Sequence, residues 1–177
     1  MINSYFKKLS TSLDNINQED LYDIVDLIKK TTTTENNIFI FGNGGSSSTA
    51  SHFAQDMNKM LSCRFISLND NTPSLLAYAN DIGFESIFEL QLTKLIKKND
   101  LVIGISGSGN SKNVINAITF AKNFGCQTIG FTGFDGGKVK QIVDKSLHIP
   151  CDDMQICEDC HMISTHLILK IMMNENE

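Results

Sequence analysis

The chain has 177 residues, 41% of them hydrophobic and 20% charged, which is the composition of one globular domain with a buried core. A net charge of −5 and a pI near 5.3 disfavour nucleic acid as the main partner, because no broad basic face is available to neutralise phosphates. No apolar run approaches the ~20 residues that a membrane span needs. A single phosphate group stays compatible with this charge, since helix N-termini and backbone amides bind an anion without net positive charge.

The opening stretch, Ile2 to Lys30, carries apolar residues at helical spacing and predicts one or two amphipathic helices. These positions are Phe6, Leu9, Leu13, Leu21, Ile24, Leu27 and Ile28. Such helices need a surface to cover, and in an oligomer that surface belongs to a neighbouring subunit. The first residues include acids and no apolar signal-peptide core, so we expect a cytoplasmic protein. Five cysteines, an odd number without a disulfide framework, also suit a reducing compartment.

Short apolar runs then alternate with helical patterns along the rest of the chain. The predicted strands are Asn37–Gly42, Arg64–Leu68, Asp100–Ser106, Thr128–Thr132 and Lys145–Ile149. The predicted helices are Ser46–Leu61, Ser74–Ala79, Asn113–Phe124, Lys138–Ile142 and Cys157–Asn174. This order predicts a single α/β domain over residues 1–177, with an N-terminal helical segment (1–35) and a core (36–177). The core is a three-layer sandwich, a central parallel sheet flanked by helices. In such sheets ligands bind at the carboxyl ends of the strands.

Two strand-to-helix loops are rich in glycine and serine. The first runs Gly42-Asn43-Gly44-Gly45-Ser46-Ser47-Ser48, and the second Ser106-Gly107-Ser108-Gly109-Asn110-Ser111. Glycines let the backbone approach a ligand closely, while serine hydroxyls and helix N-termini supply donors. Either loop alone is equally well explained as a turn with a helix cap, but two such loops, each after a buried strand, favour an anion site. Neither loop has the GK[ST] of a Walker A motif or a GxGxxG, so nucleotide binding is disfavoured.

Two groups of side chains offer acid/base or metal chemistry. His52 and Asp56 are four residues apart, so they share one face of the predicted helix after the first loop. Glu158, His161 and His166 lie on the last helix. A His and an Asp four residues apart are more often part of a solvated helix face. Because His52 and Asp56 follow a predicted phosphate loop, we favour an acid/base or metal-binding role for them. We interpret His161 as a packed or surface histidine that takes no part in metal binding, since it lies off the face of His166.

Cys157 and Cys160 form a lone CxxC. A zinc site of this type needs a second such pair, which the chain lacks. We therefore expect two half-buried thiols on one helix face.

These motifs carry a resemblance to a known family. The segment FGNGGSSSTASHFAQDM resembles the first signature of the phosphoheptose isomerases, and GISGSGNSKNVINAI resembles the phosphate-binding signature of SIS (sugar isomerase) domains. Asn80–Phe84, FTGFDGGKVKQIVD and the terminal helix are also similar, in one register along nearly the whole chain. The resemblance implies the SIS fold.

It also implies the site residues. The serines that match those holding the substrate phosphate are Ser46, Ser106, Ser108 and Ser111, and Asn43 lies beside the sugar. The full set of expected substrate contacts is Asn43, Gly44, Gly45, Ser46, Asp81, Ser106, Gly107, Ser108, Ser111 and Glu158. Gly107 departs from the family, which usually has threonine there.

The resemblance implies a zinc ion on residues of the first and last core helices. The matching positions are His52, Asp56, Glu158 and His166. Two depart from the family: Asp56 stands for a glutamate and Glu158 for a glutamine, although both still offer ligand atoms for Zn²⁺. Glu158 and His166 are eight residues apart, roughly 12 Å along a continuous helix, so one ion reaches both only if the helix begins later or two subunits contribute. Family members are tetramers with active sites between subunits, which implies a shared site.

The implied activity is the aldose–ketose isomerisation of sedoheptulose 7-phosphate to D-glycero-D-manno-heptose 7-phosphate through an enediol. Asp56 and His166 are the expected acid/base pair, with Glu158 as the alternative base. Two other hypotheses stay open. One is a non-catalytic SIS protein that binds a phosphosugar or regulates a partner, although two histidines and two carboxylates favour an enzyme. The other is an isomerase of a pentose or hexulose phosphate.

Overall fold

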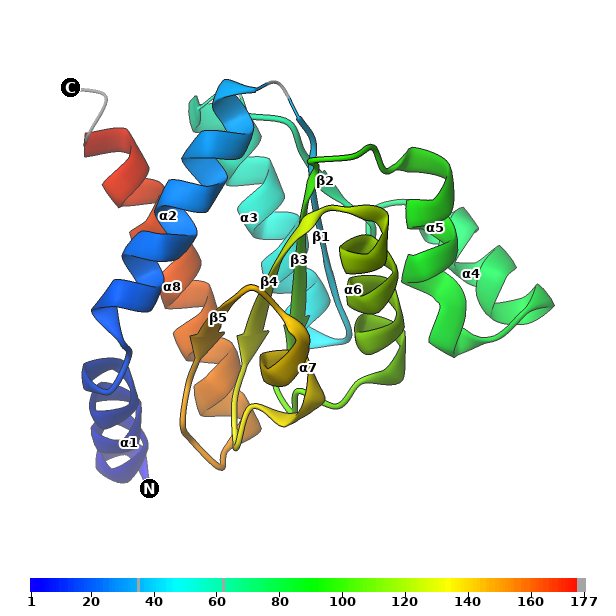
Figure 1. The fold of residues 1–177 in the computed structure, drawn as a ribbon. Helices are drawn as coiled ribbons and strands as arrows, with labels where there is room; N and C mark the ends of the chain where they lie inside the picture. The colour runs from blue at the N-terminus through cyan, green and yellow to red at the C-terminus, as the bar shows by residue number, and fades with distance from the viewer. Residues whose placement is uncertain (35, 62, 175–177) are drawn as a thin grey trace.

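The computed structural model describes residues 1–34, 36–61 and 63–174. Its centre is a sheet of five parallel strands in the order β2-β1-β3-β4-β5 (Figure 1). The strands are β1 (Ile38–Gly42), β2 (Phe65–Ser67), β3 (Leu101–Ser106), β4 (Gln127–Thr132) and β5 (Lys145–His148). The sequence order reverses direction between β1 and β3, so the loops that follow these two strands open at the same place on the sheet edge.

Helices cover both faces of the sheet (Figure 1). In chain order they are α1 (Ile2–Asp14), α2 (Gln18–Thr33), α3 (Gly45–Leu61), α4 (Thr72–Asp81), α5 (Ile87–Leu95), α6 (Lys112–Phe124), α7 (Gly137–Ile142) and α8 (Met154–Asn174), with a short 3₁₀ helix η1 (Phe84–Ser86) before α5. This confirms the predicted three-layer α/β fold with a central parallel sheet.

The alternation of side chains along β1 explains the two cores. Ile38 and Ile40 point to a core shared with α2, α3 and α8, while Phe39 and Phe41 point to a core shared with α5 and α6. All four side chains are fully buried. Because successive residues of a strand face opposite sides, a strand buried on both faces has no polar positions. The continuous apolar run of the sequence follows from this double burial.

The predicted elements are all present, with ends shifted by up to about three residues, the usual uncertainty of such boundaries. The opening stretch forms two helices, α1 and α2, separated where the Asn17 side chain accepts a hydrogen bond from the Glu19 backbone and caps α2. The sequence interpretation missed α5 and η1. Helix α5 buries Ile87, Phe88 and Leu92 under the sheet, a spacing of one helix face.

The N-terminal helix packs on the protein's own α8. The Tyr5 hydroxyl donates a hydrogen bond of 2.6 Å to Asp159, and Lys8 pairs with Asp152 at 2.8 Å. The same helix leaves Ile2 and Phe6 largely exposed. None of the helices in the described part of the chain is long and apolar enough to cross a membrane.

Candidate active site

The two glycine- and serine-rich loops enclose one small cavity. It measures about 230 Å³ and opens at the carboxyl ends of β1 and β3, which are hydrogen-bonded neighbours in the sheet. The residues that line it are Asn43, Gly44, Ser46, Ile105, Ser106, Gly107, Ser108, Ser111, Met154 and Glu158. All of these except Ile105 and Met154 belong to the set expected from the sequence. We call this cavity the cradle.

Backbone geometry holds the second loop in place. The Gly107 carbonyl accepts a hydrogen bond of 2.7 Å from the backbone of Gly133, and the Gly109 carbonyl accepts one of 2.9 Å from Val139. Gly109 has a φ of +67°, and a Cβ atom there would overlap the carbonyl group of Gly136. Glycine is therefore required at this turn both for its φ angle and for the close approach. The loop is anchored to β4 and α7 rather than free to move.

The cradle presents neutral donors rather than cations. Helices α3 and α6 both begin beside its lining residues, so the positive ends of their dipoles lie at the cavity. The Ser106 hydroxyl donates to that of Ser111 at 3.0 Å, and Ser111, which precedes α6, makes no side-chain cap. Of the described residues that line the cradle, none is lysine or arginine. Such an arrangement suits a phosphate group.

Two side chains of α8 close the cradle from the other side. The carboxylate of Glu158 lies against Gly45, where a Cβ atom would overlap it. The sulfur of Met154 lies against Gly107 in the same way, so it fills the space that a side chain at this position would need. Any side chain at position 107 would therefore require Met154 to move. The carboxylate of Glu158 is the one charged group in the described lining of the cradle.

Asp81 lies apart from the cradle. It is the exposed last residue of α4, and its carboxylate accepts a hydrogen bond of 2.8 Å from the side chain of Asn80. Neither the cradle nor the adjoining cavity of about 520 Å³ includes it in its lining. That adjoining cavity shares Asn43 and Ser111 with the cradle. The expected role of Asp81 in substrate binding stays a prediction.

Three acid/base side chains converge at a second place, on the seam between α3 and α8. The Nε2 atoms of His52 and His166 are 2.9 Å apart, and the same His52 atom is 3.3 Å from Asp56 Oδ2. The imidazole rings of the two histidines meet edge to face. Ligand atoms of all three residues lie within 4.8 Å of one another, the one such group among the described His, Cys, Asp and Glu side chains. Glu158 is not part of it.

The cradle and this three-residue group lie along the same pair of helices. Gly45 faces Glu158, and His52 faces His166, so α3 and α8 run side by side in the same direction. The step from Gly45 to His52 is about two helical turns, or roughly 10 Å along the axis of α3. A ligand held at both places must therefore be an extended molecule with an anion at one end.

The three-residue group fits a metal ion. His52 Nε2 is within reach of both His166 and Asp56, yet a neutral imidazole nitrogen carries at most one proton and satisfies only one of them. A divalent cation among the three atoms would satisfy all of them at once. Two imidazoles and one carboxylate are ligands that Zn²⁺ accepts, and three protein ligands leave a coordination position for substrate.

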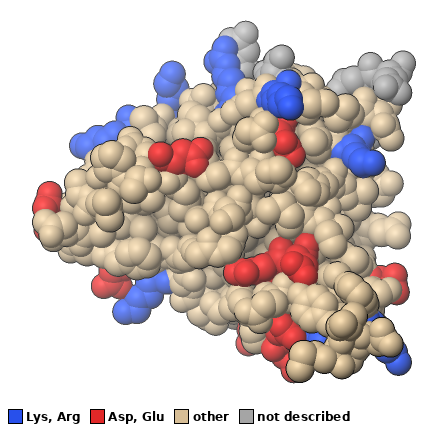
Figure 2. All heavy atoms as spheres, turned by 180° about the vertical axis from the view of Figure 1, so that it is seen from behind, with Lys and Arg blue, Asp and Glu red and all other residues tan. Residues whose placement is uncertain are grey.

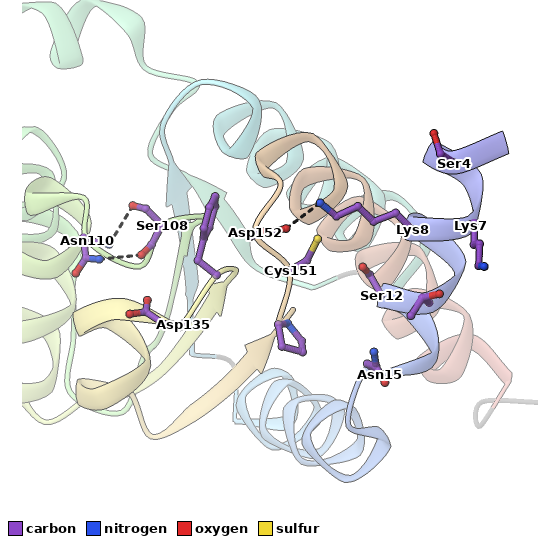
Figure 3. Close-up of a pocket in the computed structure, with 13 residues that line it drawn as sticks. Ser4, Lys7, Lys8, Ser12, Asn15, Ser108, Asn110, Asp135, Cys151 and Asp152 are labelled. Atoms are coloured by element: carbon purple, nitrogen blue, oxygen red, sulfur yellow. Dashed lines mark hydrogen bonds and ion pairs between the residues drawn. The ribbon is translucent and has the colours of Figure 1, made fainter. Parts of the chain in front are cut away.

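A larger cavity of about 1000 Å³ lies between α1 and the loops that follow β3, β4 and β5 (Figure 3). Ser108 belongs to both this cavity and the cradle. Lys8 extends from α1 to Asp152 across it, which neutralises both charges (Figure 3). On the face shown in Figure 2 the lysine and arginine side chains are scattered around the margin and form no continuous basic area.

His161 lies in the core, so of the two alternatives, a packed or a surface histidine, it is the packed one. Burial lowers its pKa to about 4, so the ring is neutral at pH 7 and its Nε2–H donates to the Thr132 carbonyl at 3.2 Å. Cys157 and Cys160 are fully buried rather than half-buried, and burial raises the pKa of Cys160 to about 12. Protonated thiols are poor metal ligands, which agrees with a structural role for the CxxC.

We expect His161 to make the fold acid-sensitive. Its pKa is about 4 when folded and about 6.5 when unfolded, so between these values the unfolded chain binds more protons and stability falls as the pH is lowered. The loss amounts to roughly 3 kcal/mol, at about 1.4 kcal/mol for each pKa unit. Urea unfolding at pH 7, 5.5 and 4.5 should show a shallower loss in His161→Gln, which keeps a donor for Thr132. Equal losses in both proteins would exclude His161 as the responsible group.

Comparison with known proteins agrees with this geometry. The SIS domain family matches residues 4–133 of the chain. The phosphoheptose isomerase of Helicobacter pylori strain P12 is 41% identical over 167 residues, 90% of this chain and 85% of its own length. That of Aliarcobacter butzleri is 39% identical over 163 residues, 89% and 86% of the two chains. The solved structure of phosphoheptose isomerase GmhA from Neisseria gonorrhoeae superposes with a TM-score of 0.92 at 30% identity, covering 96% of this chain and 95% of that one. The chain therefore belongs to the SIS domain family, and within it to the phosphoheptose isomerases.

Proposed function

We propose that the chain is an aldose–ketose isomerase that converts sedoheptulose 7-phosphate to D-glycero-D-manno-heptose 7-phosphate through an enediol. The observation that carries this proposal is the two-ended site on α3 and α8, with an anion cradle at one end and acid/base side chains at the other. The phosphoheptose isomerases of Helicobacter pylori and Aliarcobacter butzleri, similar along most of the chain, support the choice of substrate.

The cradle binds the phosphate of the substrate in this proposal. Ser46, Ser106, Ser108 and Ser111 line the space, and α3 and α6 begin beside it. The sugar chain then extends along the seam toward His52 and His166. A short sugar phosphate would not span the distance of about two helical turns between the two ends.

Asp56 and His166 carry the proton transfers. The reaction moves one proton between C1 and C2 and a second between the two oxygens, so it needs a base and an acid next to the carbonyl end. Asp56 lies beside both histidines, whereas Glu158 lies at the cradle, about two turns earlier on α8. This placement favours Asp56 over Glu158 as the base, with His166 exchanging the proton on oxygen.

The same three residues, His52, Asp56 and His166, would hold a zinc ion in this proposal, and a ring nitrogen of His166 that bound the ion could not carry a proton at the same time. When bound, the ion would supply Lewis-acid polarisation of the substrate carbonyl. In this arrangement Glu158 contacts the substrate at the other end of the site. A further carboxylate ligand for the ion would have to come from a second subunit.

We also propose a homotetramer with sites shared between subunits, and a cytoplasmic location. The exposed apolar residues Ile2 and Phe6 of α1 support the first, and five free cysteines support the second. Analytical ultracentrifugation measures the oligomeric state. A protein that is monomeric by this method and still fully active would contradict the shared site.

Purified protein should convert sedoheptulose 7-phosphate, and Asp56→Asn and His166→Ala should each lower kcat by about 10²- to 10⁴-fold, the usual contribution of a general acid or base. Product analysis by NMR separates the isomers, and circular dichroism checks the fold of each variant. Binding without turnover by the wild type would instead indicate a phosphosugar-binding protein. Near-normal activity of either variant would exclude that residue from the acid/base pair.

Zinc binding should depend on the three-residue group. Elemental analysis should find about one Zn²⁺ per chain in the wild type, as for a site with three protein ligands. His52→Ala and His166→Ala should each lose most of it. The control His161→Gln, a buried histidine on the same helix α8 but outside the group, should keep its zinc. Loss of zinc in the control, or none bound to the wild type, would contradict this site.

Glu158→Gln should tighten phosphate binding. The Glu158 carboxylate lines the cradle, and its repulsion of a phosphate costs about 1 kcal/mol or more at short range in a partly hydrated site. Removing the charge while keeping the shape should lower KM for the phosphosugar by roughly tenfold, with kcat less affected. Glu158→Asp, which keeps the charge, is the matched control and should show no such gain. A raised KM in Glu158→Gln would identify the carboxylate as a favourable contact to the sugar.

A further inference from the structure

We infer that Asn113 is a positioning residue for the isomerase reaction, because it fixes the carboxamide of Asn43 in one orientation at the wall of the cradle. This inference rests on the proposed function. Asn113 is the second residue of α6 and is 2% exposed, so its polar atoms need partners within the protein. It lines the cavity next to the cradle together with Asn43 and Ser111.

The two side chains form a reciprocal pair. Asn43 Nδ2 donates to Asn113 Oδ1 at 2.9 Å, and Asn113 Nδ2 donates to Asn43 Oδ1 at 2.9 Å. They come from the loop after β1 and from the helix after β3, 70 residues apart in the chain. The pair therefore joins the two halves of the cradle through side chains, in addition to the strand pairing below it.

A backbone group determines which way the pair points. The N–H of Val114 donates to Asn113 Oδ1 at 2.9 Å. An N–H is only a donor, so the atom of Asn113 that it meets must be oxygen. The amide nitrogen of Asn113 then faces Asn43, and Asn43 must offer its own oxygen in return. The orientation passes in this way from the backbone of α6 to a side chain of the first loop.

The Asn43 carboxamide keeps bonding capacity for a ligand. Its nitrogen has a second N–H and its oxygen a second lone pair, and Asn43 lines both the cradle and the adjoining cavity. The backbone beside it is held as well, since Asn69 accepts from the Gly42 N–H at 3.1 Å and donates to its carbonyl at 2.9 Å. A polar group fixed before the substrate arrives needs no reorganisation during the reaction.

The variant Asn113→Asp has nearly the same size and shape as the wild type. It therefore tests the orientation of the hydrogen bonds to Asn43 separately from the packing of the side chain. In Asn113→Asp the oxygen that accepts from Val114 remains, but an ionised carboxylate places a second oxygen against Asn43, and no flip of Asn43 removes the repulsion. When the new carboxyl group is protonated, it donates to Asn43 as the amide does. The kcat/KM of Asn113→Asp should therefore be about tenfold below that of the wild type at pH 8, the scale of one hydrogen bond, and the ratio should rise toward one only as the pH falls through the pKa of the new carboxyl group.

Asn123→Asp is the matched control. It adds the same charge to the same helix α6 at an exposed position, and its ratio to the wild type should stay near one at every pH. A kcat/KM of Asn113→Asp equal to that of the wild type at pH 8, where the new carboxyl group is ionised, would overturn the inference.

A double-mutant cycle gives a second test that does not depend on the folding of the aspartate variant. Asn43→Ala, Asn113→Ala and the double variant are compared by kcat and KM and by the increase in Tm that inorganic phosphate produces. If Asn113 acts through Asn43, its replacement should cost severalfold in the wild type and nothing further in the Asn43→Ala background. Equal costs in both backgrounds would overturn the positioning role alone. A wild type that neither turns over sedoheptulose 7-phosphate nor is stabilised by phosphate would overturn the proposed function together with it.

Discussion

The pairing of β1 with β3 is the constraint on which the rest of the site depends. These strands are neighbours in the sheet although β2, three α-helices and the 3₁₀ helix η1 lie between them in the chain, and Gly42 is aligned with Ile105. Their carboxyl ends therefore lie together, and so do the N-termini of the helices that follow, α3 and α6. Two helix dipoles and two glycine loops then face one small space, which suits an anion although its described lining holds no lysine or arginine. The loops after β3 and β4 also touch at Gly109, where a Cβ atom would overlap the carbonyl group of Gly136, so the strand arrangement requires glycine at this position.

The seam between α3 and α8 adds the second end of the site. Because the two helices run side by side in one direction, a contact near their N-termini is followed about two turns later by another pair. Gly45 and Glu158 form the first contact, and His52 and His166 the second. The three positions that the resemblance predicts to depart from the family pattern, Asp56, Glu158 and Gly107, lie on this seam or at its start. Met154 fills the space above Gly107, so one of these departures is matched by its neighbour on α8.

Much of the architecture was predictable because buried parallel strands are apolar along their whole length and glycine loops mark their ends. The two loops predicted to form one anion site do line one cavity, because the strands before them are paired. Helix α5 was missed although Ile87, Phe88 and Leu92 have the spacing of a helix face, a signal that the flanking polar residues obscured. The partners Asn69 and Asn113 had no signal at all, because their hydrogen bonds reach Gly42 and Asn43 across the fold. The position of Glu158 depends on how α8 packs, which spacing along one helix does not reveal.

The hydrogen bonds that hold the cradle together are made by neutral groups, and this affects the electrostatic potential at the cradle. Asn69, Asn113 and the Ser106–Ser111 pair fix the loops through amides and hydroxyls. An ion pair in the same places would put a fixed charge within a few ångströms of the helix N-termini, and a carboxylate there would compete with phosphate for their amides. Neutral partners leave the field of the two helices available to the ligand. Glu158 is the exception, and its carboxylate must oppose the phosphate unless the sugar hydroxyls between them donate hydrogen bonds to it. In the proposed site, the strength of phosphate binding is therefore a balance between two helix dipoles and one carboxylate, set by how closely α8 packs on Gly45.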